Sequence, residues 1–145
     1  MERIEVGFGE HLMMDGYGCD KDKLTDINFI YDFLSSYPSE IEMTKIMPPY
    51  VFRYSGLKPE DWGVSGFVLI AESHISIHTF PEKMYLSVDI FSCKQFDREK
   101  AVEDIKRFFG IEKAEVRCLE RGLEFPKTIR KVENFMRDER IQITL

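Results

Sequence analysis

Residues 64–93 constrain the fold most, because they have the pattern of three consecutive β-strands. The first segment, GFVLIAES, is a buried apolar run, whereas HISIHTF and YLSVDIFSC alternate strictly between apolar and polar residues. Successive side chains of a strand point to opposite faces of its sheet. We therefore expect these segments to form the main part of a β-sheet.

Two other segments have the period of amphipathic helices. Residues 24–36 carry apolar residues at i, i+3, i+4 and i+7, and Pro38 is expected to end this helix. Residues 98–109 form the second helix, with Asp97 as N-cap and Gly110 just past the end. The expected apolar faces are Ile27, Ile30, Tyr31 and Leu34 in the first helix and Val102, Ile105 and Phe109 in the second.

Three further segments are expected to be extended. Residues 11–17 and 114–119 look like strands. Residues 44–54 suit an edge strand or the entry to a strand, because Pro48 and Pro49 cannot donate to a sheet ladder. The order of elements predicts an α+β fold in which residues 1–145 form a single domain, a two-layer sandwich with a mostly antiparallel sheet and helices on one face. The charged tail after Phe125 is expected to be a peripheral helix or a partly ordered end, from the interrupted helical pattern at Ile129, Val132, Phe135 and Met136.

Charge and composition exclude several classes of function. A formal net charge of −6 argues against binding of nucleic acid, which needs a concentrated basic surface, and suits a small cationic substrate. No apolar run approaches the roughly 20 residues that span a bilayer. The N-terminus has no secretion signal and the three cysteines have no paired spacing, so we expect a cytoplasmic protein without a membrane partner.

Strand alternation brings several polar side chains to one face. His74, Ser76 and His78 share a face of their strand, and Asp89 and Cys93 share a face of the next. If the two strands are neighbours, these surfaces lie side by side. His74 and His78 are roughly 13 Å apart along a strand, too far to share a metal ion, so no metal site is expected.

Taken singly, these residues have ordinary structural explanations. Cys93 and Cys118 are of a type that usually fills a core, and a strand histidine such as His74 is usually solvated. The chain also lacks the G-x-S-x-G elbow of a serine hydrolase. His74, Asp89 and Cys118 are therefore interpreted as structural.

A longer motif is more specific. The run GVSGFVLIAESHISIHTFPE at residues 63–82, continued through residues 85–93, resembles the signature of the prokaryotic S-adenosylmethionine decarboxylase family. Some thirty residues match in type, order and spacing. The resemblance implies that the chain cuts itself between Glu72 and Ser73 into a β fragment, residues 1–72, and an α fragment, residues 73–145.

In this family the serine hydroxyl attacks the preceding carbonyl and forms an ester. Elimination then leaves a pyruvoyl group, here derived from Ser73, which is the covalent cofactor and forms a Schiff base with the substrate amine. The resemblance assigns His78 as the proton acceptor and donor of processing and Ser65 as its helper hydroxyl. Cys93 matches the cysteine that donates a proton in decarboxylation.

The resemblance also implies a binding site for S-adenosylmethionine. Glu82 matches the carboxylate that binds the ribose hydroxyls. An aromatic ring from PYVFRY is expected to stack on the adenine and to face the sulfonium cation; we favour Phe52, with Tyr54 as the alternative. The family further implies a homodimer and a role in spermidine synthesis as the source of the aminopropyl donor.

Two alternatives keep the fold. A pyruvoyl-dependent arginine or ornithine decarboxylase of the same superfamily would share the processing residues, but Glu82 and the aromatic run favour S-adenosylmethionine. A non-catalytic regulatory homologue is expected to lack Ser73, His78 or Cys93, and all three are present.

Overall fold

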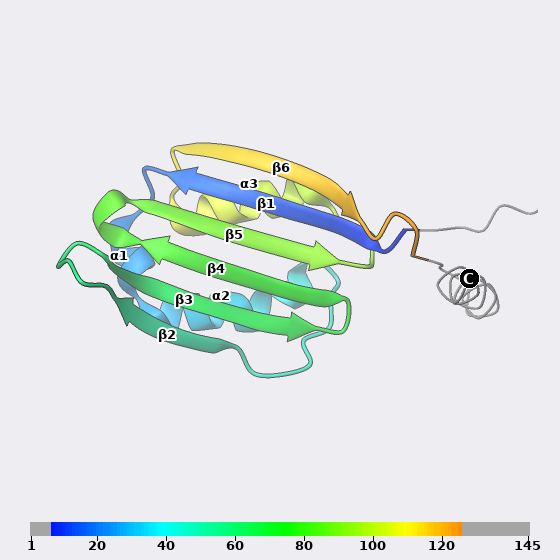
Figure 1. Ribbon diagram of the computed structural model, residues 1–145, viewed down its shortest axis with the longest axis horizontal. Coiled ribbons are helices and arrows are strands. Elements are labelled where there is room, and N and C mark those ends of the chain that lie inside the picture. The colour runs from blue at the N-terminus through cyan, green and yellow to red at the C-terminus, as the bar shows by residue number, and fades with distance from the viewer. Residues whose placement is uncertain (1–6, 126–145) are drawn as a thin grey trace, which may run out of the picture.

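The fold is a six-stranded antiparallel sheet with helices on one face (Figure 1). The computed structural model describes residues 7–125, so the helical pattern expected in the tail lies outside the described residues. The strand order is β2-β3-β4-β5-β1-β6, and every pairing is antiparallel. The elements are β1 (Gly9–Tyr17), α1 (Lys21–Thr25), α2 (Ile27–Glu40), β2 (Tyr50–Ser55), β3 (Trp62–Ile70), β4 (Ser73–Phe80), the 3₁₀ turn η1 (Pro81–Lys83), β5 (Tyr85–Ser92), α3 (Arg98–Phe109) and β6 (Lys113–Arg121).

The predicted α+β sandwich is confirmed. Helices α2 and α3 lie side by side behind the sheet, and in the described part of the chain no element covers its other face, which we call the open face (Figure 1). Alternation sorts β4 as expected, because Ile75 and Ile77 are fully buried toward the helices while His78 is exposed on the open face. None of the described helices is long and apolar enough to cross a bilayer.

Helix α3 has the predicted bounds. The Asp97 carboxylate accepts a hydrogen bond from the Lys100 N–H, and Gly110 ends the helix in the left-handed conformation that glycine tolerates. Ile105 and Phe109 are buried as expected, and Val102 is half-buried.

The prediction for the first helix was wrong in its bounds. Leu24 belongs to the short α1, and α2 begins at Ile27 because the Asp26 carboxylate caps it by accepting from two backbone N–H groups. The helix also continues past Pro38 to Glu40, and the proline ring packs in the core within the last turn.

The predicted apolar stripe of α2 was half right. Ile30 and Leu34 are buried, whereas Ile27 and Tyr31 are 39% and 38% exposed. The buried face turns instead toward α3, where Phe33 packs edge-on against Phe109. The side chains of α2 that the core takes up are Ile30, Phe33, Leu34, Tyr37 and Pro38.

Candidate active site

The predicted processing residues lie in two groups at opposite ends of β4. Glu72, Ser73 and Cys93 meet at the turn between β3 and β4, which we call the cleavage turn. Ser65 and His78 lie together near the other end, on the open face. The structure therefore forms two half-sites rather than one site in a single chain.

The backbone at the cleavage turn has an unusual conformation. Ser73 has φ of 154°, a positive value that residues with a side chain rarely adopt. The carbonyl oxygen of Glu72 accepts a hydrogen bond from the Cys93 N–H at 2.9 Å. The predicted scissile peptide is thus both strained and polarised by a backbone donor.

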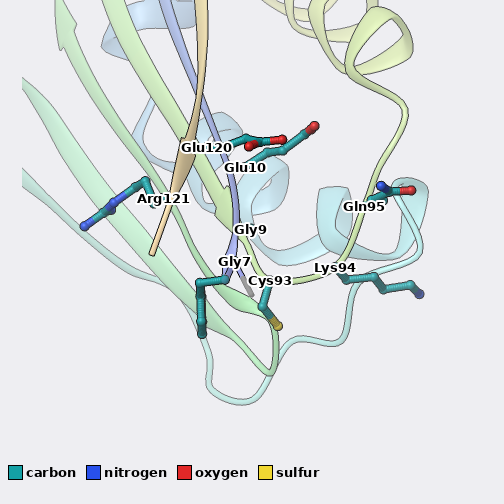
Figure 2. Close-up of a pocket in the computed structure, with 9 residues that line it drawn as sticks. Gly7, Gly9, Glu10, Cys93, Lys94, Gln95, Glu120 and Arg121 are labelled. Atoms are coloured by element: carbon teal, nitrogen blue, oxygen red, sulfur yellow. The ribbon is translucent and has the colours of Figure 1, made fainter. Parts of the chain in front are cut away.

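Cys93 lies just beyond the end of β5, and its side chain is exposed. It borders a cavity of about 100 Å³ at the end of the sheet (Figure 2). In Figure 2 the Cys93 thiol points away from the strand that carries Gly9, and the carboxylates of Glu10 and Glu120 point in the other direction. The thiol is therefore accessible to a small molecule bound at the cleavage turn.

Gly9 allows this arrangement by its lack of a side chain. A Cβ atom at this position would lie 1.9 Å from the Ser92 carbonyl oxygen and 2.6 Å from the Cys93 Cα. Only glycine lets β1 approach the Cys93 backbone so closely. The sequence analysis missed this residue, because its role depends on a contact between segments far apart in the chain.

The second half-site is a hydrogen-bonded pair. Ser65 on β3 is directly opposite His78 on β4, and the Ser65 Oγ lies 3.0 Å from the His78 Nδ1. The hydroxyl engages one ring nitrogen of the imidazole in a hydrogen bond, which leaves the other ring nitrogen available to a reacting group. The pair can therefore act as a base if a reacting group reaches it.

Within one chain, no reacting group from the cleavage turn reaches that base. Ser73 and His78 are five residues apart on one strand, a separation of about 16 Å. Direct proton transfer needs hydrogen-bond distance. A His78 that acts on Ser73 has to come from another copy of the chain.

A larger cavity of about 560 Å³ adjoins the Ser65–His78 pair. Aromatic side chains make up part of its wall, an arrangement that suits a flat ring system. Phe52 lies opposite Ser65 on the neighbouring strand but does not line the cavity, whereas Tyr54 does. The main side chains around it are Tyr54, Leu57, Trp62, Ser65, His78 and Phe80.

Glu82 lies beside this cavity in η1. Its carboxylate accepts hydrogen bonds from the Lys21 ammonium at 3.0 Å and from the Trp62 Nε1–H at 3.2 Å. The hydrogen bond from Lys21 and then that from Trp62 lower the pKa of Glu82, so the group is ionised at neutral pH. The sequence did not predict the contacts of Lys21 and Trp62 with Glu82, because neither residue shares a recognisable motif with it.

A histidine cluster on the open face was also missed in part. The His11 Nε2 lies 3.6 Å from the Asp89 Oδ1 and makes no hydrogen bond in the described structure, and the His11 ring meets His74 edge-on. Burial, followed by the charge of His11, lowers the pKa of His74. His11 thus lies next to both His74 and Asp89, the two residues for which a structural role is expected.

Cys118 lies far from either half-site. It faces the helix layer opposite Leu12 on β1 and is half-buried. Among residues 7–125, no group of three His, Cys, Asp or Glu side chains is arranged to hold a metal ion.

Comparison with known proteins gives one consistent result. The family model described as S-adenosylmethionine decarboxylase matches residues 10–122. The S-adenosylmethionine decarboxylase proenzyme of Pyrococcus furiosus is 38% identical over 118 residues, 80% of each chain. That of Geobacillus kaustophilus is 35% identical over 127 residues, 86% of this chain and 95% of its own. The crystal structure of the adenosylmethionine decarboxylase from Aquifex aeolicus matches with a TM-score of 0.67 and 29% identity, covering 86% of this chain and 98% of that one.

Proposed function

This chain belongs to the S-adenosylmethionine decarboxylase family, and we propose that it is a self-processing, pyruvoyl-dependent decarboxylase of S-adenosylmethionine. The observation that carries the proposal is the cleavage turn, where a strained Ser73 follows a carbonyl held by the Cys93 N–H. The exposed thiol of Cys93 lies at the same place. One turn thus supplies the bond to be cut and the acid needed afterwards.

Self-cleavage starts from the backbone itself. The Ser73 Oγ attacks the Glu72 carbonyl carbon, the peptide C–N bond breaks, and an ester replaces the amide while the Ser73 nitrogen becomes an amine. The Cys93 N–H stabilises the negative charge that develops on the Glu72 oxygen. A base then removes the Ser73 α-proton, and the main-chain carboxylate of Glu72 leaves as the C-terminus of the first fragment. The resulting enamine tautomerises to an imine. Water hydrolyses the imine, so that oxygen replaces nitrogen and ammonia is released.

The base in this scheme is His78, supplied by a second protomer. Large apolar side chains of the open face are more than a third exposed, and their burial would drive two sheets together. A two-fold axis that sets the strands of the two sheets antiparallel lays the cleavage turn of one protomer over the Ser65–His78 pair of its partner. The exposed residues concerned are Tyr50, Phe52, Tyr54, Phe67, Leu69 and Phe80.

In the processed enzyme the pyruvoyl group at position 73 supplies the carbonyl that accepts the electrons left when carbon dioxide departs. The Cys93 thiol delivers the proton to the former α-carbon, a task that suits an exposed thiol adjacent to position 73. The arrangement of residues fits the group, because Ser73 is half-buried and lies next to Cys93.

The cavity beside His78 favours a nucleoside substrate. Its aromatic wall suits the adenine, and the ionised Glu82 beside it is a strong acceptor for the ribose hydroxyls. Tyr54 and Phe52 remain the two candidates for stacking, and the cavity lining supports Tyr54. The product is the aminopropyl donor for spermidine. A free, exposed cysteine such as Cys93 suits the reducing cytoplasm.

The test is release of carbon dioxide from carboxyl-labelled substrates by the purified protein. We expect release from S-adenosylmethionine and none from arginine or ornithine. Release from arginine or ornithine alone would assign the chain to the alternative decarboxylases, and no release from any of the three would contradict the proposed activity.

A further inference from the structure

The connector between α2 and β2 runs along the outside of the cleavage turn. The Thr44 N–H donates to the Glu72 Oε1 at 2.7 Å, and the Thr44 carbonyl accepts from the Ala71 N–H at 2.8 Å. One residue further on, Lys45 forms a bridge with Ile70. The connector therefore pairs with the end of β3 and contacts the cleavage turn through one backbone and one side-chain hydrogen bond.

Glu72 is consequently held from two directions. Its carboxylate is bound by Thr44 and its carbonyl oxygen by the Cys93 N–H. The connector is in turn tied to the end of β5, because the Lys94 ammonium donates to the Glu42 carbonyl oxygen at 2.8 Å. The turn, the connector and the end of β5 thus form one hydrogen-bonded unit.

This double hold accounts for the strained backbone. A residue with φ of 154° relaxes to an ordinary conformation unless its neighbours fix it. Ser73 itself is fixed on its C-terminal side by the β4 ladder, beginning with its pairing to Ser92. On its N-terminal side, two hydrogen bonds fix Glu72, one to its carbonyl oxygen and one to its side-chain Oε1.

From this geometry we infer that the Glu72 side chain is a positioning residue for self-cleavage. By accepting the Thr44 N–H, its carboxylate holds the Glu72–Ser73 peptide in the strained conformation and keeps the carbonyl on the Cys93 N–H. The carboxylate is directed at Thr44, so it is not the base. The inference rests on the proposed function, because it concerns the first step of the self-cleavage described there.

The experiment follows self-cleavage of newly made protein with time, comparing the parent chain with Glu72→Ala and Glu72→Gln. A hydrogen bond to a charged group is worth roughly a ten-fold effect or more, so Glu72→Ala should cleave at least about ten-fold more slowly. Glu72→Gln keeps an acceptor oxygen and should recover most of the rate. Glu103→Ala, which removes an exposed carboxylate from the outer face of α3, is the matched control and should cleave like the parent.

A second measurement isolates the first step. Hydroxylamine cuts esters but not peptides, so brief treatment measures the fraction of chains that have passed from amide to ester. That fraction should fall in Glu72→Ala and return in Glu72→Gln. Thermal unfolding is measured on the Ser73→Ala background, in which the chain stays uncut. The single variant Ser73→Ala and the double variant that adds Glu72→Ala should melt within a few degrees of each other.

Three results would overturn the inference. The first is parent-like cleavage by Glu72→Ala. The second is equal loss of cleavage in Glu72→Gln and Glu72→Ala, which would indicate that Glu72 acts as a base. The third is a large drop in melting temperature with Glu72→Ala, which would indicate a merely structural role. Failure of the parent chain to cleave would instead contradict the proposed function, so the two failures are distinguishable.

Discussion

At the scale of single residues, Ser73 and Cys93 are brought together by strand register. Ser73 begins β4 directly opposite Ser92, the last residue of β5, so the next residue along, Cys93, meets the cleavage turn. Its backbone N–H is bonded to the Glu72 carbonyl and its thiol is exposed. In the proposed mechanism the two residues therefore act at one place but in different steps.

This division of roles predicts different phenotypes for two substitutions. Ser73→Ala removes the nucleophile and should remain one chain without activity. Cys93→Ala keeps the backbone N–H and should cleave at least partly, but should decarboxylate about 100-fold more slowly or worse, because a positioned acid is lost. Denaturing gels and carbon dioxide release measure the two effects.

Cys118→Ala is the control for loss of a thiol, because that cysteine lies on the helix side of β6. It should cleave and decarboxylate like the parent. Full decarboxylase activity in uncleaved Ser73→Ala protein would refute the pyruvoyl mechanism.

Glu82 allows a prediction about pH. Its pKa is lowered by Lys21 and Trp62, so the carboxylate stays ionised as the pH falls below the usual value for glutamate. Glu82→Gln should raise KM for S-adenosylmethionine by roughly ten-fold, the effect of one hydrogen bond to a charged group, and most of that ratio should persist at about pH 4, where an ordinary glutamate is largely protonated. A KM ratio that collapsed between about pH 5 and pH 4 would show that Glu82 titrates normally and is not held by Lys21.

At the scale of elements, α2 and α3 are joined by the buried carboxylate of Asp104. It accepts hydrogen bonds from the Tyr37 hydroxyl at 3.0 Å, from Lys100 at 2.6 Å and from Arg107 at 2.9 Å. Burial alone would raise the pKa of Asp104, but these three donors outweigh it and lower the pKa. The carboxylate is therefore ionised in the folded protein and holds the helix layer together behind the sheet.

Asp104→Asn should lower the free energy of unfolding by about 1–3 kcal/mol at pH 7. Because the folded pKa is lowered, the contribution is fully present above the pKa of an unfolded aspartate and is lost as the pH falls through the folded value. The difference between Asp104→Asn and the parent should therefore shrink below about pH 4. Urea unfolding on a Ser73→Ala background measures this, and a difference that grows toward acid pH would contradict the assigned pKa direction.

The sequence was informative where the signal is local. The period of two from residue 73 to residue 92 predicted β4, β5 and their shared polar face, and the caps Asp97 and Gly110 predicted the bounds of α3. It was uninformative where the determinant is a distant contact. Packing against α3 decides which face of α2 is buried, as in the hydrogen bond between Tyr37 and Asp104, which are 67 positions apart. The sequence of α2 alone therefore could not predict that face.

The candidate site was also only partly predictable from the sequence. The motif around Ser73 indicated the residue types, but not that the Ser65–His78 pair and the Ser73–Cys93 contact lie near opposite ends of β4. Nor did it indicate the hold of Thr44 on Glu72, because residues 44 and 72 become neighbours only through the sheet. Motifs identify chemistry, whereas the meeting of distant segments decides which groups share a site.

At the level of the whole molecule, the proposed mechanism draws its two half-sites from two chains. This predicts complementation between variants that are each defective. Coexpressed Ser73→Ala and His78→Ala chains should form mixed dimers in which the intact His78 of one faces the intact Ser73 of the other, so that the His78→Ala chain is cut. Differently tagged chains and a denaturing gel identify which chain is cleaved.

Coexpression of two differently tagged His78→Ala chains is the control, and neither should be cut at the mixed-dimer rate. Cleavage of the His78→Ala chain to the same extent in both experiments would refute the shared site, because His78 would then be dispensable.

Self-cleavage before Ser73 and conversion of that residue into the cofactor are the basis of the proposed function. The most direct test is the intact mass of the purified protein under denaturing conditions. The account predicts two fragments, residues 1–72 and residues 73–145, the second lighter by one ammonia than a fragment beginning with serine and lacking a free amino terminus. A single species at 17.1 kDa, or a second fragment with an intact N-terminal serine, would contradict it.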